Sequence, residues 1–121
     1  MKAHAAFASE PCREALELMA ARFRALGEPL RLRLLQLLEG SEISVSELAR
    51  TAGTSQPNVS KHLGVLQMVG LVQRRQEGSV ALYSISDDSV FALCELVCSG
   101  VRERLTQQIG AISLNGFGRR R

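Results

Sequence analysis

Two sets of side chains in this sequence of 121 residues could do chemistry. Cys94 and Cys98 are four residues apart, so in a helix their thiols share one face, about one turn from each other. One soft metal ion or metalloid could bind both sulfurs. The second set is a run of short polar and basic side chains, namely Ser55, Gln56, Asn58, Ser60, Lys61 and His62.

The polar run favours an interaction with DNA. In a helix that enters the major groove, Gln and Asn pair with adenine, while Ser, Lys and His reach phosphates or base edges. The helix N-terminus itself attracts phosphate through its free N–H groups and its dipole. Arg74 and Arg75 follow in the chain and would add salt-dependent affinity for the DNA backbone. By itself, the run also fits an ordinary capped helix with a solvated face.

The elements that must position these side chains follow from the spacing of apolar residues. In the first part of the chain such residues recur at intervals of three and four, which predicts a helix over about 11–26 that ends at Gly27. Pro29 suits the first turn of a second helix, which is apolar nearly all round and ends at Gly40. This second helix should lie in the centre of the core.

The middle of the chain predicts a helix-turn-helix over 46–69, followed by a hairpin. Ser46 and Ser55 are suited to cap two short helices, with Gly53 closing the first of them. Alternating apolar and polar residues on both sides of a Glu-Gly-Ser turn then predict two antiparallel strands over 71–85. A hairpin directly after a helix-turn-helix is a wing.

The last predicted element is a long helix over 87–112, capped by the Ser-Asp-Asp sequence at its start. Its apolar side is too large for one small domain to cover, which indicates a dimerisation helix. Residues 1–10 and 115–121 are expected to lack fixed structure. The fold class is therefore mostly α with a small β-hairpin wing, in a single winged helix-turn-helix domain spanning 1–121.

Composition sets further limits. The net charge of +3 and the pI of about 9.1 fit a nucleic-acid-binding protein. No apolar run approaches the roughly 20 residues that span a bilayer, so we expect a cytoplasmic protein without a membrane partner. Three cysteines in a reducing compartment argue against a disulfide framework. Without a Gly-rich phosphate loop, and without a His near a nucleophile in the sequence, we do not expect an enzyme.

Three stretches of the chain carry a family resemblance: ALGEPLRLRLLQLL, ISVSELARTAGTSQPNVSKHLGVLQMVGLVQRR and EGSVALYSI. Over about 23–85 the chain resembles the ArsR/SmtB family of winged helix-turn-helix repressors. The resemblance implies a homodimer joined through the N-terminal and C-terminal helices. It also implies that the dimer sits on an imperfect palindrome in double-stranded DNA and leaves when an inducer binds. The implied recognition residues are Ser55, Gln56, Asn58, Ser60 and His62.

The inducer sites of many ArsR/SmtB relatives are missing from this chain. Where such relatives carry a thiol pair in a segment resembling ELCVCDL, this sequence has Ser44 and Ser46. Hydroxyls do not replace thiolates as ligands of soft metals. Other relatives bind zinc or similar ions through Asp and His on the last helix, which here contains no His. Cys94 and Cys98 remain as candidate ligands.

Cys12 could supply a third sulfur if the first and last helices pack together as the resemblance implies. Cys12, Cys94 and Cys98 would then suit trivalent arsenic or antimony, or another thiophilic metal ion acting as inducer. Two alternatives stay open: redox or persulfide sensing without a metal, with Cys12 as a disulfide partner, and plain apolar packing of the cysteines. A winged helix that binds protein instead of DNA is the other competing function. The charges of Lys61, Arg74 and Arg75 argue against it.

Overall fold

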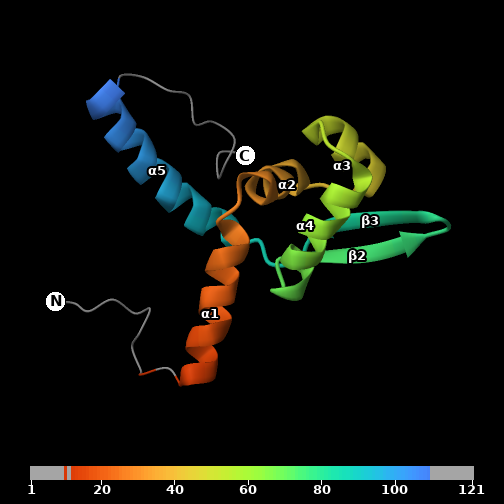
Figure 1. Cartoon of the computed structure of the whole chain (residues 1–121), viewed down its shortest axis with the longest axis horizontal. Coiled ribbons are helices and arrows are strands. Elements are labelled where there is room, and N and C mark those ends of the chain that lie inside the picture. The colour runs from red at the N-terminus through yellow and green to blue at the C-terminus, as the bar shows by residue number, and fades with distance from the viewer. Residues whose placement is uncertain (1–9, 11, 110–121) are drawn as a thin grey trace.

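The computed structural model describes residue 10 and residues 12–109 of the chain. The described part is mostly helical with one small antiparallel sheet, which confirms the predicted fold class. Its elements are α1 (Arg13–Leu26), α2 (Pro29–Leu38), β1 (Ile43–Ser44), α3 (Val45–Ala52), α4 (Gln56–Met68), β2 (Val72–Glu77), β3 (Val80–Ile85) and α5 (Val90–Ile109). Figure 1 shows α2, α3, α4 and the sheet gathered in one body, from which α1 and α5 extend. We refer to this body as the head and to α1 and α5 as the arms.

The first two helices form as their sequences predict. Gly27 follows α1, and its N–H donates to the Arg24 carbonyl. Pro29 occupies the first turn of α2, where its missing N–H costs no helical hydrogen bond. The carboxylate of Glu28 caps this helix, accepting from the N–H of Leu30 at 2.7 Å. α2 ends at Leu38, slightly before the expected stop at Gly40.

The helix-turn-helix is present with one boundary shifted. The prediction that Ser46 caps the first of its helices is wrong, because the cap is Ser44, whose hydroxyl accepts from the N–H of Glu47 at 3.2 Å. Ser46 lies inside α3. Gly53 ends α3 in the left-handed region, with φ of 75°, a conformation that favours glycine. Ser55 caps α4, as predicted.

The hairpin is also present, and it gains a third strand. β2 and β3 pair antiparallel from Val72 opposite Ile85 to Glu77 opposite Val80. β1 pairs antiparallel with the other edge of β3, so the strand order is β1-β3-β2. Two residues are too few to show the alternation of a strand, and β1 was therefore not predicted.

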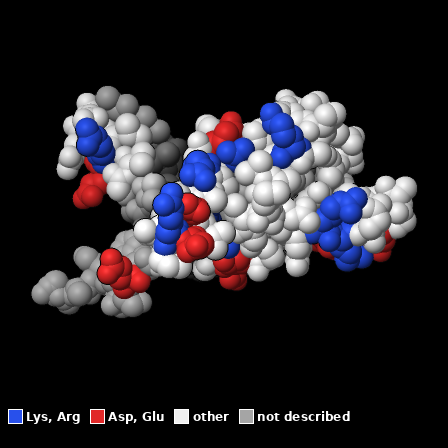
Figure 2. All heavy atoms as spheres, turned by 60° about the horizontal axis from the view of Figure 1, so that its bottom comes forward, with Lys and Arg blue, Asp and Glu red and all other residues white. Residues whose placement is uncertain are grey.

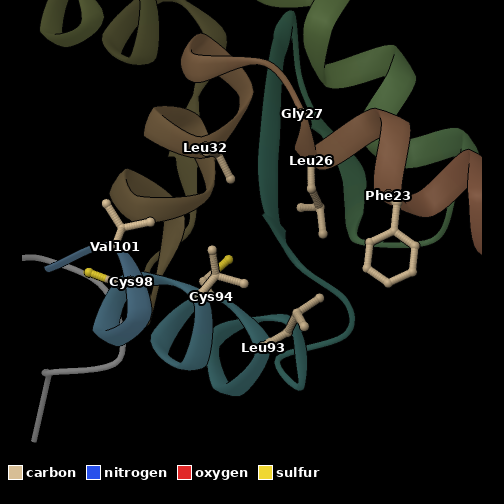
Figure 3. A pocket seen from close by; sticks show the side chains of 9 residues that line it. Phe23, Leu26, Gly27, Leu32, Leu93, Cys94, Cys98 and Val101 are labelled. Atoms are coloured by element: carbon tan, nitrogen blue, oxygen red, sulfur yellow. The ribbon is translucent and has the colours of Figure 1, made fainter. Parts of the chain in front are cut away.

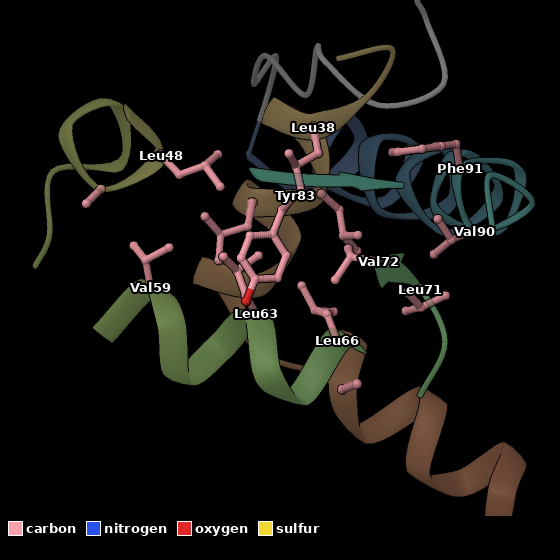
Figure 4. Close-up of a cluster of buried hydrophobic side chains, with 14 residues drawn as sticks. Leu38, Leu48, Val59, Leu63, Leu66, Leu71, Val72, Tyr83, Val90 and Phe91 are labelled. Carbon is pink, nitrogen blue, oxygen red and sulfur yellow. The ribbon is translucent and has the colours of Figure 1, made fainter. Parts of the chain in front are cut away.

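The hydrophobic core lies in the head (Figure 4). Its largest fully buried side chains are Leu34, Leu35, Leu38, Leu48, Val59, Leu63, Leu66 and Leu71. The central position predicted for α2 is confirmed by its three buried leucines. The arms add little to this core. Ala25 is the buried residue of α1, and Val90 and Phe91 come from the first turn of α5.

The last helix begins at Val90, after a turn in which Asp87 Oδ1 accepts from the N–H of Ser89 at 3.1 Å and from its hydroxyl at 2.6 Å. The expectations for residues 110–112 and 115–121, and for 1–10 apart from Glu10, lie outside the described residues. Among the described helices, none has the length and apolar character needed to cross a membrane.

Candidate functional site

The exposed side of α4 starts at its first turn. Val59 and Leu63 are fully buried, whereas Gln56, Ser60 and Lys61 are exposed. Gln56 and Ser60 are four residues apart and therefore lie one above the other on the same side of the helix. The first turn also carries free N–H groups and the positive end of the helix dipole. Lys61 is about 100° further round the helix than Ser60. We refer to Gln56, Ser60 and Lys61 as the exposed strip, which offers an amide, a hydroxyl and an ammonium group to base edges and phosphates.

Ser55 and Asn58 partly serve the local structure. The Ser55 hydroxyl accepts from the Asn58 N–H at 3.2 Å, which caps α4. The side chain of Asn58 is half-buried, and its Nδ2 donates to Thr54 Oγ1 at 3.0 Å. Thr54 thus orients the Asn58 amide, a role that the sequence pattern did not indicate. The side-chain amide of Gln56, in contrast to that of Asn58, has no hydrogen bond to another described side chain that would fix its orientation.

His62 does not belong to the exposed strip: the expectation that it lies on the helix surface is wrong, and its contact with DNA stays a prediction. The side chain is 9% exposed, and its Nδ1 lies 3.0 Å from Arg31 Nη1. Because a guanidinium can only donate, Nδ1 accepts and the ring proton resides on Nε2. Desolvation lowers the pKa of His62, with Glu28 opposing and Arg31 and Lys61 reinforcing the shift. Position 62 follows Val59 by three residues and shares its inward side.

The two arginines of β2 differ in their partners. Arg75 forms two hydrogen bonds with the Glu42 carboxylate, at 2.8 and 3.0 Å, and lies 3.7 Å from Glu77. Its hydrogen bond lowers the pKa of Glu42. Arg74 donates to Gln76, and among the described residues it has no carboxylate partner. Figure 2 shows Lys and Arg gathered with carboxylates at the end of the molecule that carries the hairpin. Arg74 is therefore the arginine of β2 that no carboxylate of the described residues neutralises.

Glu42 is a functional neighbour that the sequence analysis missed. It precedes Arg75 by 33 residues, and only the pairing of β1 with β3 brings the two side chains together. Since β1 has no pattern of its own, no local signal could have joined them.

Cys94 and Cys98 line a cavity of about 370 Å³ between α5, α2 and the end of α1 (Figure 3). The other lining residues are Phe23, Leu26, Gly27, Leu32, Leu93, Val97 and Val101. Figure 3 shows the Cys94 sulfur among the apolar side chains and the Cys98 sulfur at their edge. Burial raises the pKa of the Cys94 thiol, and Cys98 and Glu39 raise it further. Arg102 Nη2 donates to Cys98 Sγ at 3.7 Å.

Cys12 does not join this cavity within one chain. It is exposed at the N-cap of α1, while Phe23 and Leu26 reach the cavity from the opposite end of the helix. The helical rise from Cys12 to Phe23 corresponds to roughly 16 Å. Among the described residues, no three His, Cys, Asp or Glu side chains are grouped to hold a metal ion. A three-sulfur set is therefore not assembled inside a single subunit.

The comparisons with known proteins agree with this arrangement. A family described as a helix-turn-helix domain matches residues 26–75. A probable mercury resistance operon repressor of Streptomyces lividans is 41% identical over 91 residues, covering 75% of this chain and 72% of that protein. A homodimeric winged helix-turn-helix DNA-binding domain from Mycobacterium bovis, a possible ArsR-family regulator, is 32% identical with a TM-score of 0.70. The alignment covers 84% of this chain and 96% of that one. This chain belongs to the ArsR/SmtB family.

A third ArsR/SmtB comparison concerns a possible transcriptional regulator for arsenical resistance. Its structure is 31% identical with a TM-score of 0.56, covering 74% of this chain and 93% of that one. In the present ArsR/SmtB chain, Ser44 and Ser46 occupy the start of α3, and their hydroxyl oxygens lie 3.3 Å apart. Ser44 serves as the helix cap. These hydroxyls serve the local fold.

Proposed function

We propose that this chain is a DNA-binding transcriptional repressor that works as a homodimer. The observation that carries the proposal is the exposed strip of Gln56, Ser60 and Lys61 on α4, beside a hairpin that presents Arg74. A helix of this size fits the major groove, and an adjacent hairpin can follow the phosphates. Gln56 and Asn58 supply base recognition, while Ser55, Ser60 and Lys61 reach phosphates or base edges. Arg74 supplies salt-dependent affinity, and Arg75 contributes less because Glu42 already holds it.

The arms support the homodimer. Several of their large hydrophobic side chains are exposed, with fractions of 47% for Leu16, 73% for Leu18, 59% for Phe23, 73% for Leu96, 58% for Val97 and 44% for Val101. Patches of this kind mark protein interfaces, and a two-fold axis lets one patch cover its own copy. The homodimeric state of the Mycobacterium bovis relative supports the same arrangement. Two α4 helices would then read half-sites of an imperfect palindrome, about one DNA turn apart.

The DNA contact is tested with Gln56→Ala. We expect this variant to lose discrimination between operator and random duplex by about 10-fold or more, because a bidentate amide contact contributes roughly 1–3 kcal/mol. Gln67→Ala is the matched control, since Gln67 is an exposed glutamine in the last turn of the same helix. Fluorescence anisotropy with both duplexes measures the ratio. Equal discrimination by the two variants would place the recognition surface elsewhere.

We further propose that the inducer is thiophilic and binds Cys94 and Cys98. Trivalent arsenic or antimony, or another soft metal ion, is the chemical class favoured by two sulfurs in an apolar cavity. The names of the mercury and arsenical resistance relatives support this class. Any third sulfur, from Cys12, would have to come from the partner subunit, because the three sulfurs are not grouped in one chain.

The position of the cavity connects this site to DNA release. Phe23 and Leu26 of α1 face Leu93 and Cys94 of α5 across it, so a bound ligand alters how the arms pack. A 100-fold loss of DNA affinity needs about 2.7 kcal/mol of coupling between the two sites. Because the pKa of Cys94 is raised, ligand binding displaces a proton and strengthens as the pH rises.

A thiol switch without metal is the second candidate. The observation that favours it is the presence of two thiols in the cavity with no third ligand grouped beside them in the described chain. In this case a mild oxidant or a persulfide donor converts a thiolate to an oxidised sulfur species and releases the DNA.

One titration separates the two candidates. Reduced protein bound to a labelled operator is titrated in parallel with arsenite, antimonite, mercuric ion, zinc ion, hydrogen peroxide or a persulfide donor. Fluorescence anisotropy follows the release of the DNA. We expect release by arsenite or mercuric ion, with a sulfur-to-metal absorbance band, that Cys94→Ser and Cys98→Ser abolish. Cys12→Ser tests the contribution from across the dimer. Release by the oxidant or the persulfide donor alone would support the metal-free thiol switch. An unchanged response of the Cys94→Ser, Cys98→Ser double variant would contradict both the thiophilic inducer and the thiol switch.

A further inference from the structure

α1 has little apolar contact with the head. Ala25 is its buried residue, and Leu26 packs against the core from its edge. Two arginines add polar links near the same end of the helix. Arg31 of α2 donates to the Ala25 carbonyl at 2.7 Å and contacts His62 of α4 at 3.0 Å. This first link joins the last turn of α1 to the middle of α4.

The second link is Arg22 of α1. Its Nη2 donates to the Val69 carbonyl at 2.7 Å, and its Nη1 donates to Asp87 Oδ2 at 2.8 Å. Val69 is the C-cap of α4, and Asp87 lies in the turn before α5. The single planar guanidinium therefore binds both the C-terminal end of α4, where the helix dipole is negative, and the turn that precedes α5. Ser89 and Arg22 both lower the pKa of Asp87 by hydrogen bonding to its carboxylate.

The backbone beside this contact leaves room for the guanidinium. A Cβ on Gly70 would lie 3.2 Å from Arg22 Nη2, which is a tight contact. Gly70 also has φ of +82°, in the left-handed region. The turn after α4 thus allows the approach of the Arg22 side chain.

We infer that Arg22, with Asp87, is a positioning residue that sets the angle of the recognition helix α4 relative to the dimerising arms. Two separate links fix an angle, whereas one link leaves a pivot. Without Arg22, α1 keeps the link that Arg31 makes to the Ala25 carbonyl and can swing about it relative to the head, in which α4 stays packed. In a homodimer this swing changes the separation of the two α4 helices. The inference rests on the proposed homodimeric, DNA-binding function.

Arg22 lies beside residues that line the cysteine cavity. Phe23 and Leu26 line that cavity, and together with Arg22, Met19 and Leu93 they line a smaller adjoining hollow. A ligand that moves α1 away from α5 therefore acts directly on the link between Arg22 and Asp87. The same pair would transmit the state of the arms to α4.

The test measures how strictly the dimer requires one half-site spacing. A palindromic operator is selected from random duplexes with the wild-type chain, and derivatives lose or gain one or two central base pairs. Arg22→Met is compared with Arg13→Met, a control on the same helix whose arginine forms an exposed pair with Glu17. We expect wild type and the control to prefer one spacing by about 30-fold, and Arg22→Met by only about 3-fold. Affinity for a single half-site should stay unchanged in all three proteins.

The outcomes are distinct. If Arg22→Met keeps the spacing preference of Arg13→Met, the positioning role is wrong, whatever happens to total affinity. Asp87→Asn removes the ion pair but leaves the Val69 link, so we expect an intermediate preference. This variant decides the question if Arg22→Met does not fold, and an unchanged preference in it overturns the inference. Sedimentation of the wild-type chain on operator is the separate check of the homodimer, because a monomeric complex would contradict the proposed function instead.

Discussion

The head and the arms of this chain differ in how far their large apolar side chains are buried. The head encloses leucines from α2, α3 and α4 that are 0% exposed, and Val72 and Tyr83 of the sheet belong to the same buried cluster (Figure 4). The arms place large side chains in solvent, among them Leu18 and Leu96, each 73% exposed. One chain is therefore sufficient to build the part that faces DNA. The part that sets the spacing of two such units needs a second copy.

This difference also separates two kinds of function. The proposed recognition strip lies on the head, where the buried side chains of Val59, Leu63 and Leu66 anchor α4 in the core. The cysteine cavity lies at the junction of the arms with α2, where a hollow of about 370 Å³ separates their side chains. In the function proposed above, a ligand in this cavity acts on the packing of α1 and α5, whose residues line it. In the function proposed above, the head carries specificity and the arms carry regulation.

The largest expected effect compares a buried with an exposed leucine. Leu63→Ala should lower the free energy of unfolding by about 2–5 kcal/mol, because it opens a cavity in the head. Leu96→Ala, on the exposed side of α5, should change the unfolding of the head by less than about 0.5 kcal/mol. Urea unfolding at several protein concentrations separates this effect from dimer dissociation. Similar losses in both variants would show that the arms belong to the same cooperative core.

The next prediction concerns the arms. Val97→Asp should raise the dissociation constant of the dimer by about 100-fold, or roughly 2.7 kcal/mol, because it buries a carboxylate in an apolar interface. Ser99→Asp is the control, with the same charge on the opposite side of the same helix. Sedimentation measures the dimer, and circular dichroism checks that the head stays folded. A dimer that tolerates Val97→Asp would place the interface on another surface.

The sequence predicted the head well because its signals are local. Caps such as Ser55, the left-handed Gly53 and the inward spacing of Val59 and Leu63 each depend on neighbours within one or two turns. One error was local, since the cap of α3 is Ser44 and not Ser46. The others arose where a residue's environment depends on distant parts of the chain. His62 was expected on the outside since it sits in a polar run, yet Arg31 of another helix satisfies its ring nitrogen.

The candidate site shows the same limit. Gln56, Ser60 and Lys61 could be recognised from composition and helical phase, and the structure places them in solvent. The different partners of Arg74 and Arg75 could not be predicted from the sequence, because the pairing of the short strand β1 with β3 brings Glu42 to Arg75. The location of Cys12 also depends on the direction of a whole helix. Spacing in sequence places Cys94 near Cys98 but says nothing of a residue at the far end of α1.

A smaller effect distinguishes the two arginines within the head. Arg74→Gln should reduce the slope of log affinity against log salt concentration by about 1, since it removes a cation available to phosphate. Arg75→Gln should reduce it by less, because the charge of Arg75 is already paired with Glu42. Binding to nonspecific duplex between about 50 and 200 mM salt measures both slopes. Equal slopes would mean that Arg75 exchanges Glu42 for phosphate on the DNA.

The smallest expected effect tests the junction between α1 and the head through His62. Its folded pKa lies below the ordinary value of 6.5, chiefly because of desolvation, while Glu28 opposes and Arg31 and Lys61 reinforce the shift. The unfolded chain therefore takes up a proton first as the pH falls. The contribution of neutral His62 is fully present above pH 6.5 and is lost as the pH drops toward the folded pKa.

His62→Gln isolates this contribution, because glutamine can still accept from Arg31 but does not titrate. We expect the unfolding free energy of wild type to fall more steeply than that of the variant between pH 6.5 and about 5. Asp87 does not interfere in this window, since its pKa is lowered from 3.8 and its contribution is lost only in stronger acid. Parallel curves would mean that the ring is protonated without cost. The head would then open to water at its contact with α1, which would weaken the contrast between a closed head and adaptable arms.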